Sequence, residues 1–144
     1  RSGGISSPLI VHWPAGIPAR GELRKTAGHL IDIAATCCDV AGATAPADSP
    51  PLEGRSLLPV FADQPLQREA LYWEHEGNRA VRAGQWKLVA RHDQPWELYD
   101  IDTDRVEAQD LARQQPEKVR ELSTLYDRWA SRVGVAPWPL PDAR

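Results

Sequence analysis

Residues 71–100 read LYWEHEGNRAVRAGQWKLVARHDQPWELYD, and this stretch decides the fold that the sequence predicts. It contains four short segments rich in aromatic and β-branched residues, separated by turn-forming residues such as Gly77-Asn78. In the third segment the apolar residues alternate with Lys87, Val89 and Arg91, which predicts one face in contact with solvent. Four consecutive strands predict an antiparallel meander. The segments are residues 71–76, 79–83, 86–91 and 96–100.

Residues 116–133 are predicted to form an amphipathic helix that packs on this sheet. Pro116 suits the first helical position, Glu117 complements the helix dipole, and Gly134 can end the helix in a left-handed conformation. The fold class predicted for residues 63–144 is therefore α+β, a four-stranded antiparallel sheet with a packed terminal helix. The apolar stripe of the helix recurs at spacings of 3, 4, 3 and 4, at Val119, Leu122, Tyr126, Trp129 and Val133.

The first part of the chain contains one predicted strand. Residues 7–14 are a short apolar run bounded by prolines, which is typical of a strand buried on both faces of a parallel sheet. The pair Gly3-Gly4 before it predicts a tight turn. A single strand of this kind needs neighbouring strands from a larger sheet.

Residues 29–41 predict a helix that ends at Gly42. Residues 56–61 contain Pro59 and predict one helical turn at most. One strand and one helix cannot form a domain by themselves, so we expect residues 1–62 to be an incomplete part of a larger domain. The apolar stripe of the predicted helix consists of Leu30, Ile33, Ala34, Cys37 and Ala41.

The composition indicates a globular protein, because the 144 residues are 42% hydrophobic and 26% charged. The net charge of −3 argues against nucleic acid as the main partner. No apolar run approaches the roughly 20 residues that span a bilayer, so we expect no membrane partner. No basic-then-apolar leader is present to indicate secretion. The chain begins at Arg1 and contains no Met, and we expect it to be a piece of a longer protein.

Two motifs that could bind a metal ion fail on inspection. Cys37 and Cys38 are adjacent, so they are unsuited to bridge each other and too few for a zinc site, and we expect buried, reduced thiols on the helix. The acidic motif at residues 100–104 resembles the start of a calcium loop. However, Arg105 stands where that loop needs Gly and Leu111 where it needs Glu, which favours acids that form turns and cap helices.

The densest polar cluster is Glu74-His75-Glu76 followed by Asn78. Two carboxylates beside an imidazole could tune it for acid–base chemistry. On a strand, however, Glu74 and Glu76 point one way and His75 the other. The alternative is an exposed strand end that enters a hairpin, and the residues themselves leave both interpretations open.

The remaining histidines indicate no catalytic site. His29 and Asp32 lie one helical turn apart and can pair at the start of the helix without a catalytic role. His12 has no visible partner, and His92 lies in a turn. Because no phosphate-binding loop or nucleophile elbow is present either, the residues alone indicate no complete active site.

Several stretches together resemble the C-terminal part of a sulfatase of the bacterial arylsulfatase type, in the alkaline-phosphatase-like superfamily. The resemblance implies that residues 1–62 are the last strand and helix of the large α/β domain. It implies that residues 63–144 are the C-terminal antiparallel-sheet subdomain with its terminal helix. The similar stretches are residues 3–14, 29–42, 52–59, 73–82, 86–88 and 97–112.

The resemblance also implies hydrolysis of sulfuric esters by the full-length enzyme. In that family a Cys or Ser becomes formylglycine, and a calcium or magnesium ion polarises the sulfate. Neither Cys37 nor Cys38 starts the required motif, and the family's metal ligands and sulfate-binding Lys lie upstream of this chain. We therefore expect no cofactor in this piece and no activity from it alone. The resemblance fits a bacterial periplasm or cytoplasm and does not decide between them.

In these sulfatases the loop between the first strands of the small subdomain approaches the mouth of the active site. The resemblance therefore implies that His75 contacts the substrate beyond its sulfate. Glu74, Glu76 and Asn78 are lesser candidates for the same rim.

Two alternatives stay open. One is a phosphonate monoester hydrolase or phosphodiesterase of the same superfamily, and the other is a non-catalytic interaction module. If residues 1–62 lack their larger domain, the apolar run from Leu9 to Trp13 is exposed. We then expect the chain to self-associate, for example by exchange of strands.

Overall fold

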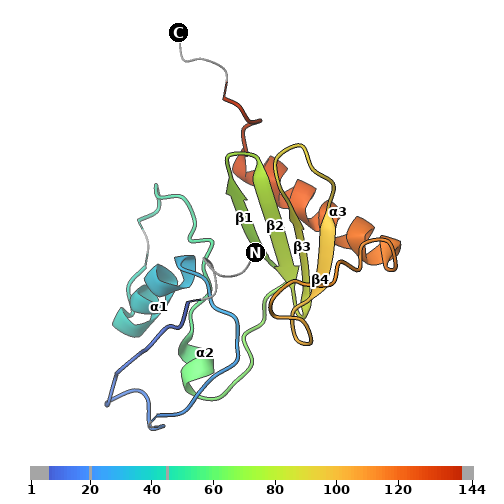
Figure 1. The fold of residues 1–144 in the computed structure, drawn as a ribbon. Helices are drawn as coiled ribbons and strands as arrows, with labels where there is room; N and C mark the ends of the chain where they lie inside the picture. The colour runs from blue at the N-terminus through green and yellow to red at the C-terminus, as the bar shows by residue number, and fades with distance from the viewer. Residues whose placement is uncertain (1–6, 20, 45, 141–144) are drawn as a thin grey trace. The chain divides into compact units, whose positions relative to one another are not determined.

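The computed structural model describes residues 7–19, 21–44 and 46–140. Contacts divide the chain at Arg68 into two compact units (Figure 1). We call Pro8–Arg68 the N-terminal unit and the residues from Glu69 onward the sheet unit. Each unit is described by itself.

The sheet unit contains the predicted antiparallel meander. Its strands lie in the order β1-β2-β3-β4, and each is paired antiparallel with the next (Figure 1). Short turns join the first three strands, as expected for hairpins in a meander. This confirms the fold class that the turn-separated segments predicted. The strands are β1 (Leu71–His75), β2 (Asn78–Ala83), β3 (Trp86–Ala90) and β4 (Glu97–Asp100).

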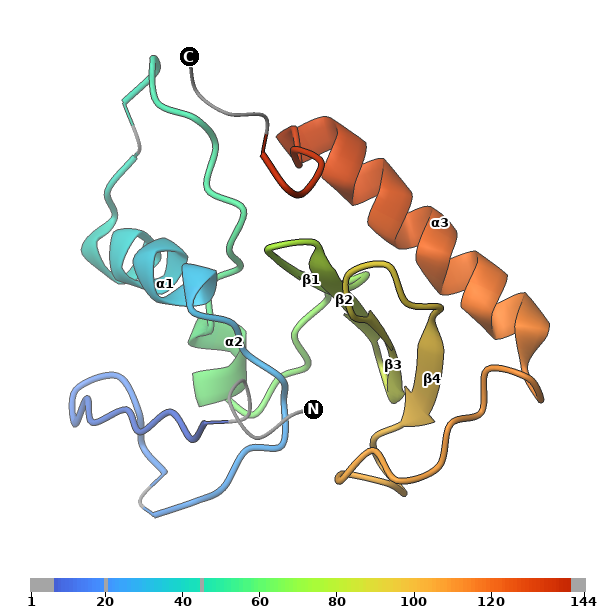
Figure 2. The same cartoon turned by 45° about the horizontal axis from the view of Figure 1, so that its top comes forward.

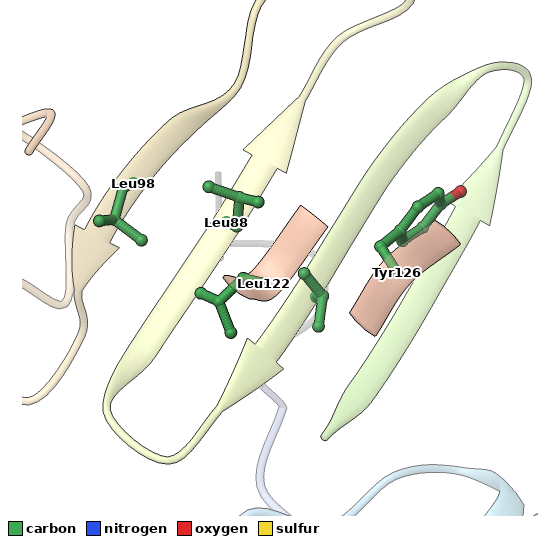
Figure 3. Close-up of a cluster of buried hydrophobic side chains, with 5 residues drawn as sticks. Leu88, Leu98, Leu122 and Tyr126 are labelled. Atoms are coloured by element: carbon green, nitrogen blue, oxygen red, sulfur yellow. The ribbon is translucent and has the colours of Figure 1, made fainter. Parts of the chain in front are cut away.

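Helix α3 (Pro116–Val133) packs across one face of this sheet, as predicted (Figure 2). It begins with Pro at its first turn and ends at Gly134, which has a left-handed φ of 72°. Tyr72 of β1 and Trp129 of α3 stack with ring centroids 5.1 Å apart. None of the helices in the described residues is long and apolar enough to cross a membrane. The core between sheet and helix consists of Val81, Leu88, Leu98, Leu122 and Tyr126 (Figure 3).

The opposite face of β3 differs from the prediction, because Lys87 is buried instead of solvated. Its ammonium nitrogen lies 2.5 Å from a carboxylate oxygen of Glu107, whose side chain is only 1% exposed. The chain after β4 folds back along that strand, with the amide of Leu111 donating to the carbonyl of Leu98. This return brings the counter-charge that a buried ammonium requires. Strand alternation alone could not show it.

In the N-terminal unit, α1 (Ile31–Ala41) confirms the predicted helix, and Gly42 ends it with a φ of 61°. The short α2 (Leu58–Phe61) is the single helical turn expected around Pro59. The buried side of α1 is polar, however. Asp32 and Thr36 are its buried residues.

The predicted apolar stripe of α1 is exposed in this structure. Leu30 is 78% exposed and Ile33 is 42% exposed. Cys37 is also exposed and Cys38 half-buried, so the prediction of buried thiols is wrong, although both are free as expected. Among the described residues of the N-terminal unit, no apolar surface covers this stripe.

The prediction of a strand at residues 7–14 is also wrong for this structure, which has no strand among the described residues there. Leu9 is 55% exposed and Ile10 89% exposed, and a turn follows at residues 14–16. A parallel strand requires a hydrogen-bonded neighbour. None of the described residues of the N-terminal unit forms a strand that could pair with it. The predicted turn at Gly3-Gly4 lies outside the described residues.

Asp32 organises the N-terminal unit from a fully buried position. One carboxylate oxygen accepts a hydrogen bond from the backbone amide of His29 at 2.7 Å. The other accepts from the amide of Arg55 at 2.8 Å and from the guanidinium of Arg68 at 2.6 Å. Burial alone would raise the pKa of Asp32, but these donors hold it below its ordinary value. The predicted contact between His29 and Asp32 is therefore present, and the backbone amide of His29 makes it.

Thr36 and Gly54 complete the connection between α1 and the segment before α2. The Thr36 hydroxyl donates to the carbonyl of Asp32 and accepts from the amide of Leu57 at 2.9 Å. A Cβ at position 54 would lie 2.1 Å from the carbonyl oxygen of Ile31, so only glycine allows this approach. Two stretches that resemble the sulfatase family, residues 29–42 and 52–59, therefore pack against each other through these contacts.

Candidate functional site

The candidate site is the tip of the β1–β2 hairpin. Glu76 and Gly77 form its turn, with left-handed φ values of 52° and 76°. This is the backbone that a two-residue hairpin loop requires. The amide of Gly77 donates to a carboxylate oxygen of Glu74 at 2.9 Å. β1 therefore ends at His75, one residue earlier than predicted, because Glu76 belongs to the turn.

Asn78 links the tip to the loop between β3 and β4. Its side-chain nitrogen donates to the carbonyl oxygens of His75 at 2.8 Å and Glu76 at 3.4 Å. Its side-chain oxygen accepts from the backbone amide of His92 at 3.3 Å. Both polar atoms of the Asn78 amide are therefore engaged within the protein.

His92 packs directly against the turn. A Cβ added to Gly77 would lie 2.4 Å from Nδ1 of His92, so the imidazole occupies the space that a side chain at position 77 would fill. The other ring nitrogen lies 3.2 Å from a carboxylate oxygen of Asp93. The sequence interpretation set His92 aside as a turn residue. No local signal could have revealed its contact with Gly77, fifteen positions earlier.

The four predicted rim residues have different surroundings. The side chains of His75 and Glu76 are exposed at the tip. Glu74 is half-buried and Asn78 is exposed, and both direct polar atoms to the backbone of the turn. The geometry thus brings all four residues together and leaves His75 and Glu76 open to a ligand.

Arg79 is a further residue at this end of the sheet that the sequence interpretation did not single out. Its guanidinium lies over the ring of Trp96, 4.3 Å from the centroid. Trp96 in turn meets Tyr126 of α3 edge-on, with centroids 5.6 Å apart. Arg79 is also the strand partner of Glu74. The tip is therefore supported on the α3 side by aromatic packing.

The described residues do not fit a metal centre. They contain no group of three or more His, Cys, Asp and Glu side chains that could hold an ion. Asp100 accepts a hydrogen bond from the amide of Asp102 at 3.1 Å, and Asp104 accepts from the amide of Ala108 at 2.8 Å. Asp100 and Asp104 therefore stabilise turns, as expected, whereas the expected role in capping a helix is not seen for them, because no described helix begins at these residues. We therefore assign no step of hydrolysis to a metal held by these residues.

Comparison with known proteins identifies the family. The family described as "N-sulphoglucosamine sulphohydrolase, C-terminal" matches residues 2–129. An N-acetylgalactosamine-6-O-sulfatase of Bacteroides thetaiotaomicron is 29% identical over 90% of this chain, which covers 28% of that relative.

Solved structures agree. One, described under the metabolism of multiple glycosaminoglycans by Bacteroides thetaiotaomicron, is 26% identical with a TM-score of 0.60 and covers 69% of this chain. Another, a complex with its substrate D-glucosamine-2-N,6-O-disulfate, is 26% identical with a TM-score of 0.55 over the same 69%. This chain covers 24% and 23% of those two chains. It thus spans about a quarter of the length of the proteins that it matches.

The motifs that resembled a sulfatase, the sheet with its terminal helix and the family match all agree. The resemblance inferred from the sequence is confirmed. This chain belongs to the family of sulfatase C-terminal domains described as N-sulphoglucosamine sulphohydrolase, C-terminal.

Proposed function

We propose that this chain is the C-terminal part of a sulfuric ester hydrolase whose substrate is a sulfated sugar. The family match over residues 2–129 carries the proposal. The relatives support the substrate class, because those compared above are named for sulfated amino sugars or glycosaminoglycans. Since the chain spans about a quarter of these proteins, the hydrolytic activity belongs to the longer protein.

The exposed apolar residues of the N-terminal unit support the interpretation of residues 1–62 as part of a larger domain, whereas the contact boundary lies later, after Arg68, whose guanidinium binds Asp32. Ile10 and Leu30 are 89% and 78% exposed, which is unusual for large apolar side chains grouped with others. A larger α/β domain would pair residues 7–14 as a strand and cover the apolar stripe of α1. Residues 1–62 are then the last elements of that domain.

The β1–β2 tip is the part of this chain proposed to meet the substrate. His75 is exposed at the last paired position of β1, and the turn beside it holds Glu76 exposed as well. An imidazole donates hydrogen bonds to sulfate or hydroxyl oxygens, and a carboxylate accepts them from hydroxyls. These side chains suit recognition of the sugar. In the longer enzyme, formylglycine and calcium or magnesium would supply the hydrolytic chemistry.

The first experiment measures activity of the complete protein that contains this chain. We expect release of sulfate from sulfated hexosamines such as N-acetylgalactosamine 6-sulfate. Hydrolysis of phosphonate monoesters without sulfate release would contradict the proposal and favour the phosphonate monoester hydrolase alternative. No hydrolysis of either ester would leave the interaction-module alternative.

The second experiment tests the rim with His75→Ala. We expect KM for a sulfated disaccharide to rise about tenfold, the loss typical of one hydrogen bond to a charged group. Hydrolysis of a small aryl sulfate should not change, because that substrate does not extend to the rim. Gln85→Ala, in the turn at the other end of the sheet, is the matched control. Equal kinetics of the His75 variant and the control on both substrates would overturn the assignment.

A further inference from the structure

The conformation of the β1–β2 tip depends on support from outside the hairpin. β1 is at the edge of the sheet, so among the strands of the described residues His75 has a neighbour on one side only. The turn beyond it places Glu76, a residue with a Cβ, at a φ of 52°. Left-handed backbone is disfavoured for such residues. A short exposed turn of this kind needs further contacts to hold one conformation.

The loop after β3 supplies those contacts. The pairing of Arg79 with Ala90 brings the start of β2 level with the end of β3. The amide of Asn78 then joins the carbonyl of His75 at 2.8 Å to the backbone N–H of His92 at 3.3 Å. The His92 ring closes over Gly77, where a Cβ would be 2.4 Å from it. Three chain segments are thereby held together at one end of the sheet.

We propose that Asn78 and His92 are positioning residues that hold His75 in the orientation in which it meets the sugar, an inference that rests on the proposed function of His75. Asn78 acts through its side-chain amide, both ends of which are used. His92 acts through its backbone N–H and through the packing of its ring. Neither residue needs to touch the substrate. The specificity of the rim then depends on the loop between β3 and β4 as well as on the hairpin.

Glycine at position 77 is part of the same arrangement. Its φ of 76° and the ring of His92 both exclude a side chain there. The glycine therefore serves the turn and admits the imidazole. A hairpin that needed glycine only for its backbone would leave open space above that residue, as Gly84 does in the β2–β3 turn.

We call the contacts of Asn78 and His92 with the tip the brace. Nuclear magnetic resonance on the 144-residue chain tests the brace without reference to activity. The variants are Asn78→Ala, Asn78→Asp and His92→Ala, with Gln85→Ala as control. Gln85 also joins a turn to a neighbouring strand through its amide, donating to Asp100 at 3.1 Å. The readout is the χ1 rotamer distribution of His75, with amide protection of Leu88 and Leu98 as the measure of an intact sheet.

We expect Asn78→Ala and His92→Ala to broaden the His75 rotamer distribution while the core amides stay protected. Asn78→Asp keeps an acceptor for the His92 amide and loses the donor to His75, so its effect should be intermediate. The control should leave His75 unchanged. A single unchanged His75 rotamer in both alanine variants would overturn the brace.

Kinetics of the complete enzyme then test its consequence. Asn78→Ala and His92→Ala should each raise KM for a sulfated disaccharide by up to about tenfold, with kcat on a small aryl sulfate unchanged. Combined with His75→Ala they should add nothing further, because all three act through one contact. Additive losses would contradict a positioning role. If His75→Ala itself has no effect, the proposed role of His75 in binding the sugar fails. The rotamer measurement still tests whether Asn78 and His92 hold His75 in one orientation.

Discussion

The two units of this chain solve the problem of burial in opposite ways. The sheet unit closes its own apolar core, in which Leu88, Leu98 and Leu122 are fully buried. The N-terminal unit fully buries a carboxylate, Asp32, and leaves Ile10 and Leu30 largely exposed. The comparison teaches that an apolar pattern becomes a core only when the chain contains the surface that complements it. Polar contacts can order a segment that lacks that surface.

The largest expected effect breaks the sheet unit. Leu88→Ala should lower its free energy of unfolding by about 4 kcal/mol, because the side chain is fully buried and its removal leaves a cavity. Urea denaturation followed by tryptophan fluorescence measures the loss. The matched variant in the other unit, Leu30→Ala, removes a side chain that is 78% exposed and should change stability by less than about 0.5 kcal/mol. Similar losses in the two variants would contradict the comparison.

Asp32→Ala should lower the free energy of unfolding of the N-terminal unit by about 3 kcal/mol, because it leaves the Arg68 guanidinium without its buried partner. Amide hydrogen exchange of α1, together with that of the sheet as an internal reference, measures the change separately in the two units. Asp39→Ala, an exposed acid on the same helix, is the control. Loss of protection in α1 alone supports the comparison. Unchanged protection would show that the polar hub does not order the unit.

The two units should respond to opposite changes of pH. Burial lowers the pKa of His29, and the pKa of Asp32 is also below its ordinary value. In both cases the unfolded chain takes up a proton first as pH falls. The N-terminal unit should therefore lose stability below about pH 6.5 through His29 and further below about pH 4 through Asp32.

In the sheet unit, burial raises the pKa of Tyr99, with its hydrogen bond to Glu97 adding to the effect. Here the unfolded chain releases its proton first as pH rises. The sheet unit should therefore lose stability above about pH 10. Amide resonances of α1 and of the sheet, followed by nuclear magnetic resonance across pH 3–11, separate the two responses. Acid loss of the sheet before α1 would contradict this order.

The smallest effect on stability is expected at the exposed apolar run. Ile10→Lys should change the free energy of unfolding by less than about 0.5 kcal/mol, since the side chain is 89% exposed. It should reduce self-association of the chain, measured by sedimentation velocity, because it places a charge in the apolar run. Leu23→Lys, at an exposed loop position outside that run, is the control. Equal self-association of the two variants would sharpen the comparison by placing the contact elsewhere.

The sheet unit was predictable because its signals are local. Alternation, turn residues and the 3-4 spacing of α3 lie within a few residues of one another, and they specify β1 to β4 and the terminal helix. The residues that depend on distant partners were not predictable. Lys87 alternates like a solvated strand residue, and only the return of the chain at Glu107 shows why it is buried.

In the candidate site, too, local features could be predicted from the sequence and contacts between distant residues could not. Glu74, His75, Glu76 and Asn78 were proposed from one polar cluster, and the structure places them together because a hairpin tip is a local feature. The contact of His92 with Gly77 was not found, because it joins two turns that only the pairing of β2 with β3 brings together.

By itself, the sequence determined the order of the elements from α1 onward, the helix ends at Gly42 and Gly134 and the resemblance to a sulfatase, since each depends on short-range pattern. Only the tertiary structure decided that Asp32 is buried on α1 in place of Leu30. It likewise decided that Lys87 has a counter-ion and that the exposed Asn78 connects the tip to the loop between β3 and β4. The physical reason is that burial and polar pairing depend on which distant segments come into contact, and periodicity along the chain does not specify those contacts.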